Sequence, residues 1–600
     1  MKKKIALVTS GAVSLGAYEA GVLYELFTVA RQLAASGNFD YEIDVITGAS
    51  AGSVNSVVFG LSTVYNPIFI KYLKDIWVDD LSIGHLLFAL GSLTSHSLFS
   101  DRVIKNVQKR IIKSFKVDPD KNLPNRVQIG ITLSNFSGIP YWLDYPKLNK
   151  GYKFTTFADW YRLELSRSLP PSKQQLEYLT EAAAASGAFP VAFPARKLKR
   201  SLADYVGTAL TAKDDLNFTY LDGGIFNNEP INRAIELARK LDNGDERIYL
   251  LISPNPPEPL ARFSNKPVIT DVLKRLVYAV MTEAHFRDWK DAIKINKRLD
   301  WQKEFFDKMF ALGPETLKKL DSSFKELARD MAKFKAGLAE QAEQKLESRF
   351  KIEENGFVRH FTEEPKASDE KATEYLNNNK ARIQRMLQDR ETNRNTSGQS
   401  ENSDAENLLV NLVFVTECLG GLRDKAALKL HPVFPIQKLA GGFWASFGGF
   451  LDQKIRRYDF YVGRLTARKF LEAEADGGGL GLKKYMASLK PLEKPPMTVD
   501  EAEKRKTWVK IKAGLSLVIL GIVLLAILIL FDILIIWSVG LLPILSKYYQ
   551  LVLGAFLGVL LFPMWKASLL IVRGLLMILS ASSIVTKNNG GINQEEKDND

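Results

Sequence analysis

Gly48-Ala49-Ser50-Ala51-Gly52 places a serine between two glycines, each two residues away. The preceding residues, 43–47, form a short apolar-rich run that predicts a strand. Apolar residues then recur with i, i+3, i+4, i+7 spacing, which predicts one face of a helix: Val54, Val57, Val58 and Leu61. A serine on a turn between a strand and a helix is the nucleophile-elbow pattern G-x-S-x-G.

The residue types on this turn suit a nucleophilic serine. Small flanking residues allow the strand and the helix to pack closely. The Ser50 oxygen then lies at a helix N-terminus, where free N–H groups and the helix dipole favour negative charge. The alternative is a glycine-rich connection without chemistry, because G-x-S-x-G also arises by chance in small-residue loops. The strand before and the helix after favour the nucleophile.

The start of the chain repeats this strand–loop–helix order. Residues 4–9 predict a first strand, residues 10–16 a small-residue loop and residues 17–33 a helix. A βαβα order implies an α/β fold, with a parallel sheet that has helices on both faces. The loop and Ser50 should then share the C-terminal edge of the sheet, where such folds place their sites.

Backbone N–H groups of this loop are candidates to bind a substrate oxyanion, and we assign that role to Gly11, Ala12 and Val13. A dinucleotide-binding loop is the competing interpretation. The loop lacks the G-x-G-x-x-G pattern that such binding requires, so the oxyanion assignment is favoured.

Composition limits the classes of function. A chain of 600 residues is too long for one compact domain. The formal net charge is +13, which suits an anionic partner. No nucleic-acid motif is present, so we expect a membrane surface and no nucleic acid. The single cysteine, Cys418, excludes an intramolecular disulfide and a cysteine-based zinc site. We expect neither a metal nor a cofactor.

Further elements of the core follow. The runs 126–135 and 247–253 predict buried strands. Asp222 follows a short apolar run and precedes two glycines, which places it on an exposed turn. Asp-Gly most commonly marks a plain turn, so this residue alone indicates no chemistry.

Three blocks in this order resemble the patatin-like phospholipase family. They are residues 16–23 with the loop before them, residues 48–52, and Asp222-Gly223-Gly224, supported by Ala-Ser-Gly-Ala-Phe-Pro at 185–190. The resemblance covers residues 1 to about 260. It implies a patatin-like three-layer α/β fold with a mostly parallel central sheet. It also implies a serine lipid acyl hydrolase with a Ser–Asp dyad and no histidine, in which Ser50 is the nucleophile and Asp222 the base.

The N-terminal loop departs from the family pattern G-G-G-x-R/K-G. It reads Gly11-Ala12-Val13-Ser14-Leu15-Gly16, so two glycines are replaced and a leucine occupies the usual basic position. Backbone N–H donors survive the change from glycine to alanine or valine while φ stays negative, but the charge is lost. We expect weaker oxyanion stabilisation, or a basic residue from elsewhere.

An aspartate can act as the base if burial raises its pKa and it contacts the serine directly. The implied reaction is attack of Ser50 on an ester carbonyl, proton transfer to Asp222, and release of the acyl-enzyme by water. A histidine base remains an alternative, although none of the five histidines lies in a triad motif: His85, His96, His285, His360 and His431.

The middle of the chain differs in composition. Residues 270–390 are rich in Lys, Glu, Ala and Leu, which predicts long amphipathic helices. Their charges predict a solvated face; a protein-binding arm is the alternative. Residues 391–406 are small and polar, which predicts a flexible linker. The apolar run 408–416 predicts a buried strand, so the helices form an insertion. A further resemblance, to a block of some bacterial patatin-like proteins, is seen in Gly448-Gly449-Phe450-Leu451, Arg457-Tyr458-Asp459-Phe460 and Gly463-Arg464.

The C-terminus contains two uncharged apolar runs, 513–531 and 548–565. Each is close to the length of about 20 residues that spans a bilayer, so we predict a transmembrane hairpin at about 513–538 and 548–570. The basic stretch 504–512 then places the catalytic part on the cytoplasmic side. We predict a multi-pass protein of a bacterial inner membrane.

The predicted domains are a catalytic core at 1–265, a charged helical insertion with linker at 266–405, a return to the core at 406–490, a basic linker at 491–512, a transmembrane segment at 513–586 and a polar tail at 587–600.

The predicted function is phospholipase- or lysophospholipase-type hydrolysis of lipid esters at a membrane surface, with a membrane lipid as substrate and the bilayer as partner. One alternative is a catalytically weak, membrane-anchored scaffold that binds a protein through helices in 270–390. Another is an esterase or thioesterase acting on substrates outside the bilayer.

Overall fold

The fold was obtained as a computed structural model of the chain. The residues that it describes are 3–37, 41–83, 97, 99–120, 123–145, 150–190, 192–239, 241, 247–256, 294–298, 325–333, 335–336, 368–392, 410–415, 428–444, 446–473, 480–486 and 489–540.

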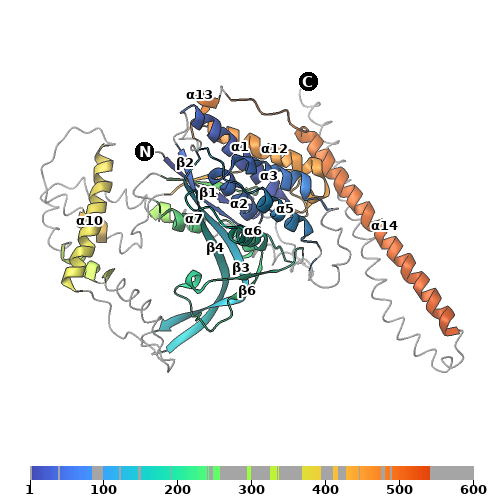
Figure 1. The fold of residues 1–600 in the computed structure, drawn as a ribbon, viewed down its shortest axis with the longest axis horizontal. Helices are drawn as coiled ribbons and strands as arrows, with labels where there is room; N and C mark the ends of the chain where they lie inside the picture. The colour runs from blue at the N-terminus through green and yellow to red at the C-terminus, as the bar shows by residue number, and fades with distance from the viewer. Residues whose placement is uncertain are drawn as a thin grey trace, which may run out of the picture.

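An eight-stranded mixed sheet runs through the centre of the described chain (Figure 1). The strands are β1 (Lys3–Thr9), β2 (Tyr41–Gly48), β3 (Arg126–Tyr145), β4 (Lys150–Ser166), β5 (Arg196–Lys199), β6 (Asn217–Leu221), β7 (Arg247–Ile252) and β8 (Lys429–Val433). Their order is β5-β6-β3-β2-β1-β7-β8, and β4 pairs with β3. The five strands β3, β2, β1, β7 and β8 are mutually parallel, whereas β4 and β6 run antiparallel to β3.

The main helices are α1 (Gly16–Ala35), α2 (Ala51–Val64), α3 (Lys71–Lys74), α5 (Arg102–Ser114), α6 (Lys173–Ser186), α7 (Ile231–Ala238), α10 (Asp369–Thr392), α12 (Gln453–Glu472), α13 (Lys483–Met486) and α14 (Val499–Gly540). Short helical turns lie between them: η1 (Val13–Leu15), η2 (Pro67–Ile70), η3 (Asp75–Asp80), η6 (Leu202–Tyr205), η7 (Gly223–Ile225) and η8 (Gly448–Leu451).

The central strand β1 shows how the sheet separates two cores. Side chains alternate between the faces of a strand. Ile5 and Leu7 pack with α1, α2 and α12, whereas Ala6 and Val8 pack with α7 on the other face. The predicted α/β architecture, with a mostly parallel sheet between helical layers, is therefore confirmed.

Helix α12 packs along α1, although more than 400 residues separate them in the sequence (Figure 1). Two glycines permit the close approach, since a Cβ at Gly21 would lie 2.0 Å from the Phe460 carbonyl oxygen and one at Gly463 2.0 Å from that of Tyr18. The fully buried Glu25 of α1 accepts hydrogen bonds from two arginines of α12, Arg464 and Arg468. Helix α12 near the C-terminus is thereby joined to α1, the first of the main helices.

One predicted strand is wrong. The described part of 408–416, residues 410–415, is helical, and the strand that returns to the sheet is β8, beside β7. A short apolar run fits a buried helix as well as a buried strand, which explains the error. Of the predicted helical segment 270–390, the described residues 294–298, 325–333 and 369–390 are helical, and most of the rest lies outside the described residues, as does 393–406.

The first predicted membrane span falls on α14, and the second lies outside the described residues. Within the part of the chain that the structure describes, no helix has both the length and the apolar character needed to cross a membrane. The predicted transmembrane hairpin therefore has no support from the structure.

Candidate active site

Ser50 lies on the sharp turn between β2 and α2, at the C-terminal edge of the sheet. Its φ is +51°, a left-handed conformation that non-glycine residues rarely adopt outside functional sites. Both flanking glycines are sterically required: a Cβ on Gly48 would lie 2.5 Å from the Gly52 carbonyl oxygen, and one on Gly52 would lie 2.5 Å from that of Ser10. The predicted elbow geometry is present.

Asp222 meets Ser50 from the end of β6, and because it is 3% exposed, the predicted exposed turn is wrong. The Ser50 hydroxyl donates to Asp222 Oδ2 at 2.5 Å, and the Gly224 N–H donates to Oδ1 at 2.8 Å. Burial raises the pKa of Asp222 to about 7, although both hydrogen bonds oppose that shift. Such a carboxyl group can accept a proton near neutral pH.

Ser186, at the end of α6, fixes the backbone of the elbow. Its hydroxyl accepts the Ser50 N–H at 2.9 Å and lies 2.8 Å from the hydroxyl of Ser53. Ser186 belongs to the Ala-Ser-Gly-Ala-Phe-Pro block that supported the family resemblance, but no role for its hydroxyl was predicted.

The three predicted oxyanion donors are not equivalent. The Gly11 N–H donates to the carbonyl oxygen of Asn228 at 3.1 Å, so it is occupied. Among the described residues, no acceptor is bound to the N–H groups of Ala12 and Val13, which leaves both available to a substrate. Gly11 instead allows a close approach, because a Cβ there would lie 2.1 Å from Asn228 Oδ1.

Val13 departs from the expected negative φ. Its φ is +51°, and for a β-branched residue this is a genuine outlier. Val13 also lines the cavity beside Ser50. The predicted oxyanion loop, residues 11–15, is therefore held in a strained conformation next to Ser50.

Leu15, at the family's basic position, is 2% exposed and lies in the main apolar core. The buried guanidinium of Arg456 donates to the carbonyl oxygens of Gly449, Phe450 and Val78. Gly449 in turn donates its N–H to Ser14 of this loop. Desolvation lowers the pKa of Arg456 to about 10. Sequence reasoning did not single out this residue, although it lies between the residues quoted for the C-terminal block that resembles some bacterial patatin-like proteins.

A network of hydrogen bonds connects Ser10, which precedes the loop, to Trp77 in the cavity wall. The fully buried Glu19 accepts hydrogen bonds from Ser10 Oγ at 3.0 Å and from Asn55 Nδ2 at 3.3 Å. Burial raises the pKa of Glu19 well above its ordinary value. Trp77 Nε1 donates to Asn55 Oδ1 at 2.6 Å, and its indole lines the cavity. The network therefore links the oxyanion loop to the wall of the cavity.

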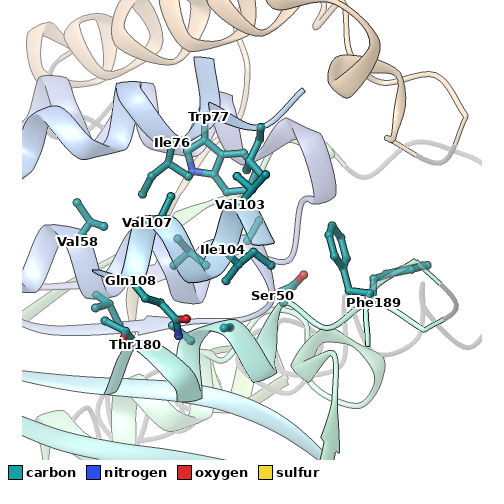
Figure 2. A pocket seen from close by; sticks show the side chains of 18 of the residues that line it. Ser50, Val58, Ile76, Trp77, Val103, Ile104, Val107, Gln108, Thr180 and Phe189 are labelled. Atoms are coloured by element: carbon teal, nitrogen blue, oxygen red, sulfur yellow. The ribbon is translucent and has the colours of Figure 1, made fainter. Parts of the chain in front are cut away.

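An apolar cavity of about 100 Å³ opens at Ser50 and extends between α2, α5 and α6. Figure 2 shows Ser50 and Phe189 at one end and Val58 at the other. Ser50, Gln108 and Thr180 are the polar lining side chains, and the rest are apolar apart from Gly187. The cavity suits a hydrocarbon chain attached to the carbonyl that Ser50 attacks.

Among the five histidines, the structure describes only His431, which lies on β8 and contacts the ring of Phe470 at a centroid distance of 6.3 Å. The other four lie outside the described residues. The hydrogen-bond acceptor observed for the Ser50 hydroxyl is the carboxylate of Asp222.

The structure thus has an α/β domain with a buried serine–carboxylate pair at the C-terminal edge of its sheet. Residues 7–235 match the model of the patatin-like phospholipase family, so the chain contains a patatin-like phospholipase domain and is an enzyme of the carboxylic ester hydrolase class. No curated protein matches the chain. Among solved structures, VipD from Legionella pneumophila aligns with 86% of this chain and 84% of its own, at 11% identity and a TM-score of 0.21.

Proposed function

We propose that the protein hydrolyses ester-linked acyl chains of lipids at a membrane surface, with Ser50 as nucleophile and Asp222 as base. The observation that carries the proposal is the 2.5 Å hydrogen bond from the Ser50 hydroxyl to a buried carboxyl group whose pKa is about 7. The direct test is labelling of Ser50 by a fluorophosphonate, with Ser50→Ala as the control.

In the first half of the reaction, Ser50 Oγ forms a bond to the ester carbonyl carbon while its proton passes to Asp222 Oδ2. The N–H groups of Ala12 and Val13 donate to the oxyanion of the tetrahedral intermediate. Asp222 then gives the proton to the departing alcohol oxygen. Water then attacks the carbonyl carbon of the acyl-enzyme while Asp222 takes its proton. The bond to Ser50 Oγ breaks, Ser50 regains a proton from Asp222, and the carboxylic acid leaves.

The lining of the cavity supports an acyl chain of medium length. The lining residues follow α2 from Ser50 to Val58, a separation of eight residues, or about 12 Å along a helix. An extended alkyl chain advances about 1.25 Å per carbon–carbon bond, so roughly ten carbons cover that distance. The polar side chains of Gln108 and Thr180 occur among the apolar lining residues.

Filling the cavity is expected to shorten the acyl chain that the enzyme prefers in its substrate. Ala184 lines it from α6 and is 3% exposed, so Ala184→Phe places a ring in the path of the acyl group. We expect kcat/KM for a decanoate ester to fall at least about tenfold, with the acetate ester changed less than about twofold. The measurement is the ratio of the two 4-nitrophenyl ester rates. An unchanged ratio would show that the acyl chain binds elsewhere.

Features of α14 support attachment to a bilayer. Five apolar side chains on α14 are about half exposed or more: Leu515, Ile519, Ile522, Val523 and Leu530. Before them, Trp508 is 47% exposed, with the cationic groups of Arg505 and Lys512 over its ring at 4.6 and 5.0 Å. Aromatic and basic residues beside an apolar segment are typical of the boundary between water and lipid. We propose the cytoplasmic face of a bacterial inner membrane as the location.

Truncation tests this attachment. A chain that ends at Lys512 retains the buried residues Ala502 and Val509 and the ion pair between Arg505 and Asp452, which join α14 to the core. We expect unchanged rates on a soluble short-chain ester. On vesicles with anionic lipid, hydrolysis should fall at least about tenfold, because the enzyme loses its high effective concentration at the surface. Equal rates on vesicles would contradict the proposed attachment.

A further inference from the structure

The oxyanion loop is bonded to a turn that lies outside the matched family domain. We call this turn, residues 446–451, the C-terminal turn; it ends in η8. The Ser14 N–H donates to the Ser446 carbonyl oxygen at 3.1 Å, and the Ser14 hydroxyl donates to the same oxygen. The Gly449 N–H donates to Ser14 Oγ at 3.1 Å. Three hydrogen bonds therefore converge on the residue that follows Val13.

Backbone strain occurs on both sides of this contact. Four non-glycine residues among those described have a positive φ: Val13, Ser50, Trp444 and Ser446. A left-handed non-glycine residue is strained and persists only where its surroundings impose that conformation. For Val13, a partner that can impose the conformation is the C-terminal turn, through the adjacent Ser14.

The C-terminal turn is itself held rigidly. Arg456, 1% exposed, donates from Nη1 to the carbonyl oxygens of Gly449 at 2.9 Å and Phe450 at 3.3 Å. Asp452 accepts the N–H groups of Lys454 and Ile455 at the start of α12, which itself packs on α1. Phe450 also lines the cavity together with Val13 and Ser50. The turn thus has a fixed position relative to the nucleophile.

We propose that the C-terminal turn is the positioning element of the oxyanion hole: through Ser14 it holds Val13 in its left-handed conformation and aims the N–H groups of Ala12 and Val13. Ser14 is then a positioning residue that does not touch the substrate. This inference rests on the proposed function, and it means that the matched domain, residues 7–235, lacks part of its own catalytic machinery.

Two glycines near the turn provide a matched pair of variants. A Cβ at Gly449 would lie 2.6 Å from Ser14 Oγ and 3.0 Å from Ser14 Cβ, so Gly449→Ala forces the turn and the loop apart. A Cβ at Gly442 would meet nothing within 4 Å, so Gly442→Ala is the control. We expect Gly449→Ala to lower kcat on a short-chain ester about tenfold to a hundredfold, with KM changed less than about twofold, because misaimed donors mainly affect the transition state. Gly442→Ala should keep the wild-type kcat.

A milder variant addresses the hydroxyl alone. Ser14→Ala removes two of the three hydrogen bonds without adding bulk, and we expect kcat to fall about tenfold. Ser62→Ala is its control, because Ser62 is fully buried and donates within its own helix to the Val58 carbonyl oxygen. If Gly449→Ala fails to fold, Ser14→Ala still decides the question.

Two inhibitors separate positioning from a general loss of structure. Octyl trifluoromethyl ketone forms a tetrahedral adduct with a nucleophilic serine, whereas 1-octanol only fills the cavity. We expect the inhibition constant of the ketone to weaken in Ser14→Ala by the same factor as kcat/KM, and that of octanol to stay within about twofold. Equal weakening of both, or wild-type kcat in both Ser14→Ala and Gly449→Ala, would overturn the inference. A wild-type protein without turnover and without fluorophosphonate labelling would overturn the proposed function itself.

Discussion

Replacement of Ser50 by alanine is expected to lower ester hydrolysis at least about a thousandfold, because no acyl-enzyme can form without the hydroxyl. The side chain is 6% exposed and small, so the change leaves only a minor cavity. The Ser50 N–H would still donate to Ser186 Oγ, and the strained turn would remain. The thermal unfolding midpoint should therefore change little.

The measurement is kcat/KM on a 4-nitrophenyl ester together with thermal unfolding. Ser62→Ala is a suitable control, since Ser62 lies further along α2, is fully buried and donates within its own helix to the Val58 carbonyl oxygen, away from the Ser50 turn. Activity of Ser50→Ala within about tenfold of the wild type would place the nucleophile elsewhere.

Replacement of Asp222 by asparagine is expected to lower kcat by about a hundredfold to ten-thousandfold, the usual contribution of a general base. An amide cannot take the proton of Ser50. The pH profile adds a second signature. Because the carboxylate is the active form and its pKa is about 7, wild-type kcat/KM should rise about tenfold per pH unit below 7 and level off above it. The variant should lack this limb.

The pH dependence of the stability of the folded protein gives an independent control for Asp222→Asn. The folded pKa of Asp222 is raised above its ordinary value of 3.8, so the folded state holds the proton more tightly and the stabilisation from this group is lost as pH rises through about 7. The melting temperature of Asp222→Asn relative to wild type should therefore increase from pH 4 to pH 8. Near-normal turnover with an intact pH limb would indicate a histidine base.

The parts of the site that the sequence predicted depend on local patterns. A strand, five small residues and a helix determine the geometry of Ser50, and all of them lie within 43–61. Asp222 was inferred from the family resemblance, because Asp-Gly-Gly alone describes an ordinary turn. Its partner lies 172 residues away, and only the fold establishes their contact.

The parts that sequence reasoning missed depend on contacts between distant segments. Val13 has a positive φ that no propensity of valine predicts, and residues more than 430 positions away hold the loop beside it. Strand β8 contains Pro432, and its polar and apolar residues do not alternate regularly. We therefore predicted a strand at the more apolar run 408–416 instead. The hydrogen bond from the Gly11 N–H likewise depends on a distant segment, because its acceptor is the carbonyl oxygen of Asn228.

Mapping the site of fluorophosphonate modification tests the central claim most directly. The full-length wild-type protein is treated with the reagent at pH 8, digested and analysed by mass spectrometry. We predict one adduct, on Ser50, formed rapidly in the wild type, at a rate lower by about a hundredfold or more in Asp222→Asn, and not at all in Ser50→Ala. An adduct on another serine, or equal modification of all three proteins, would contradict a Ser50–Asp222 dyad.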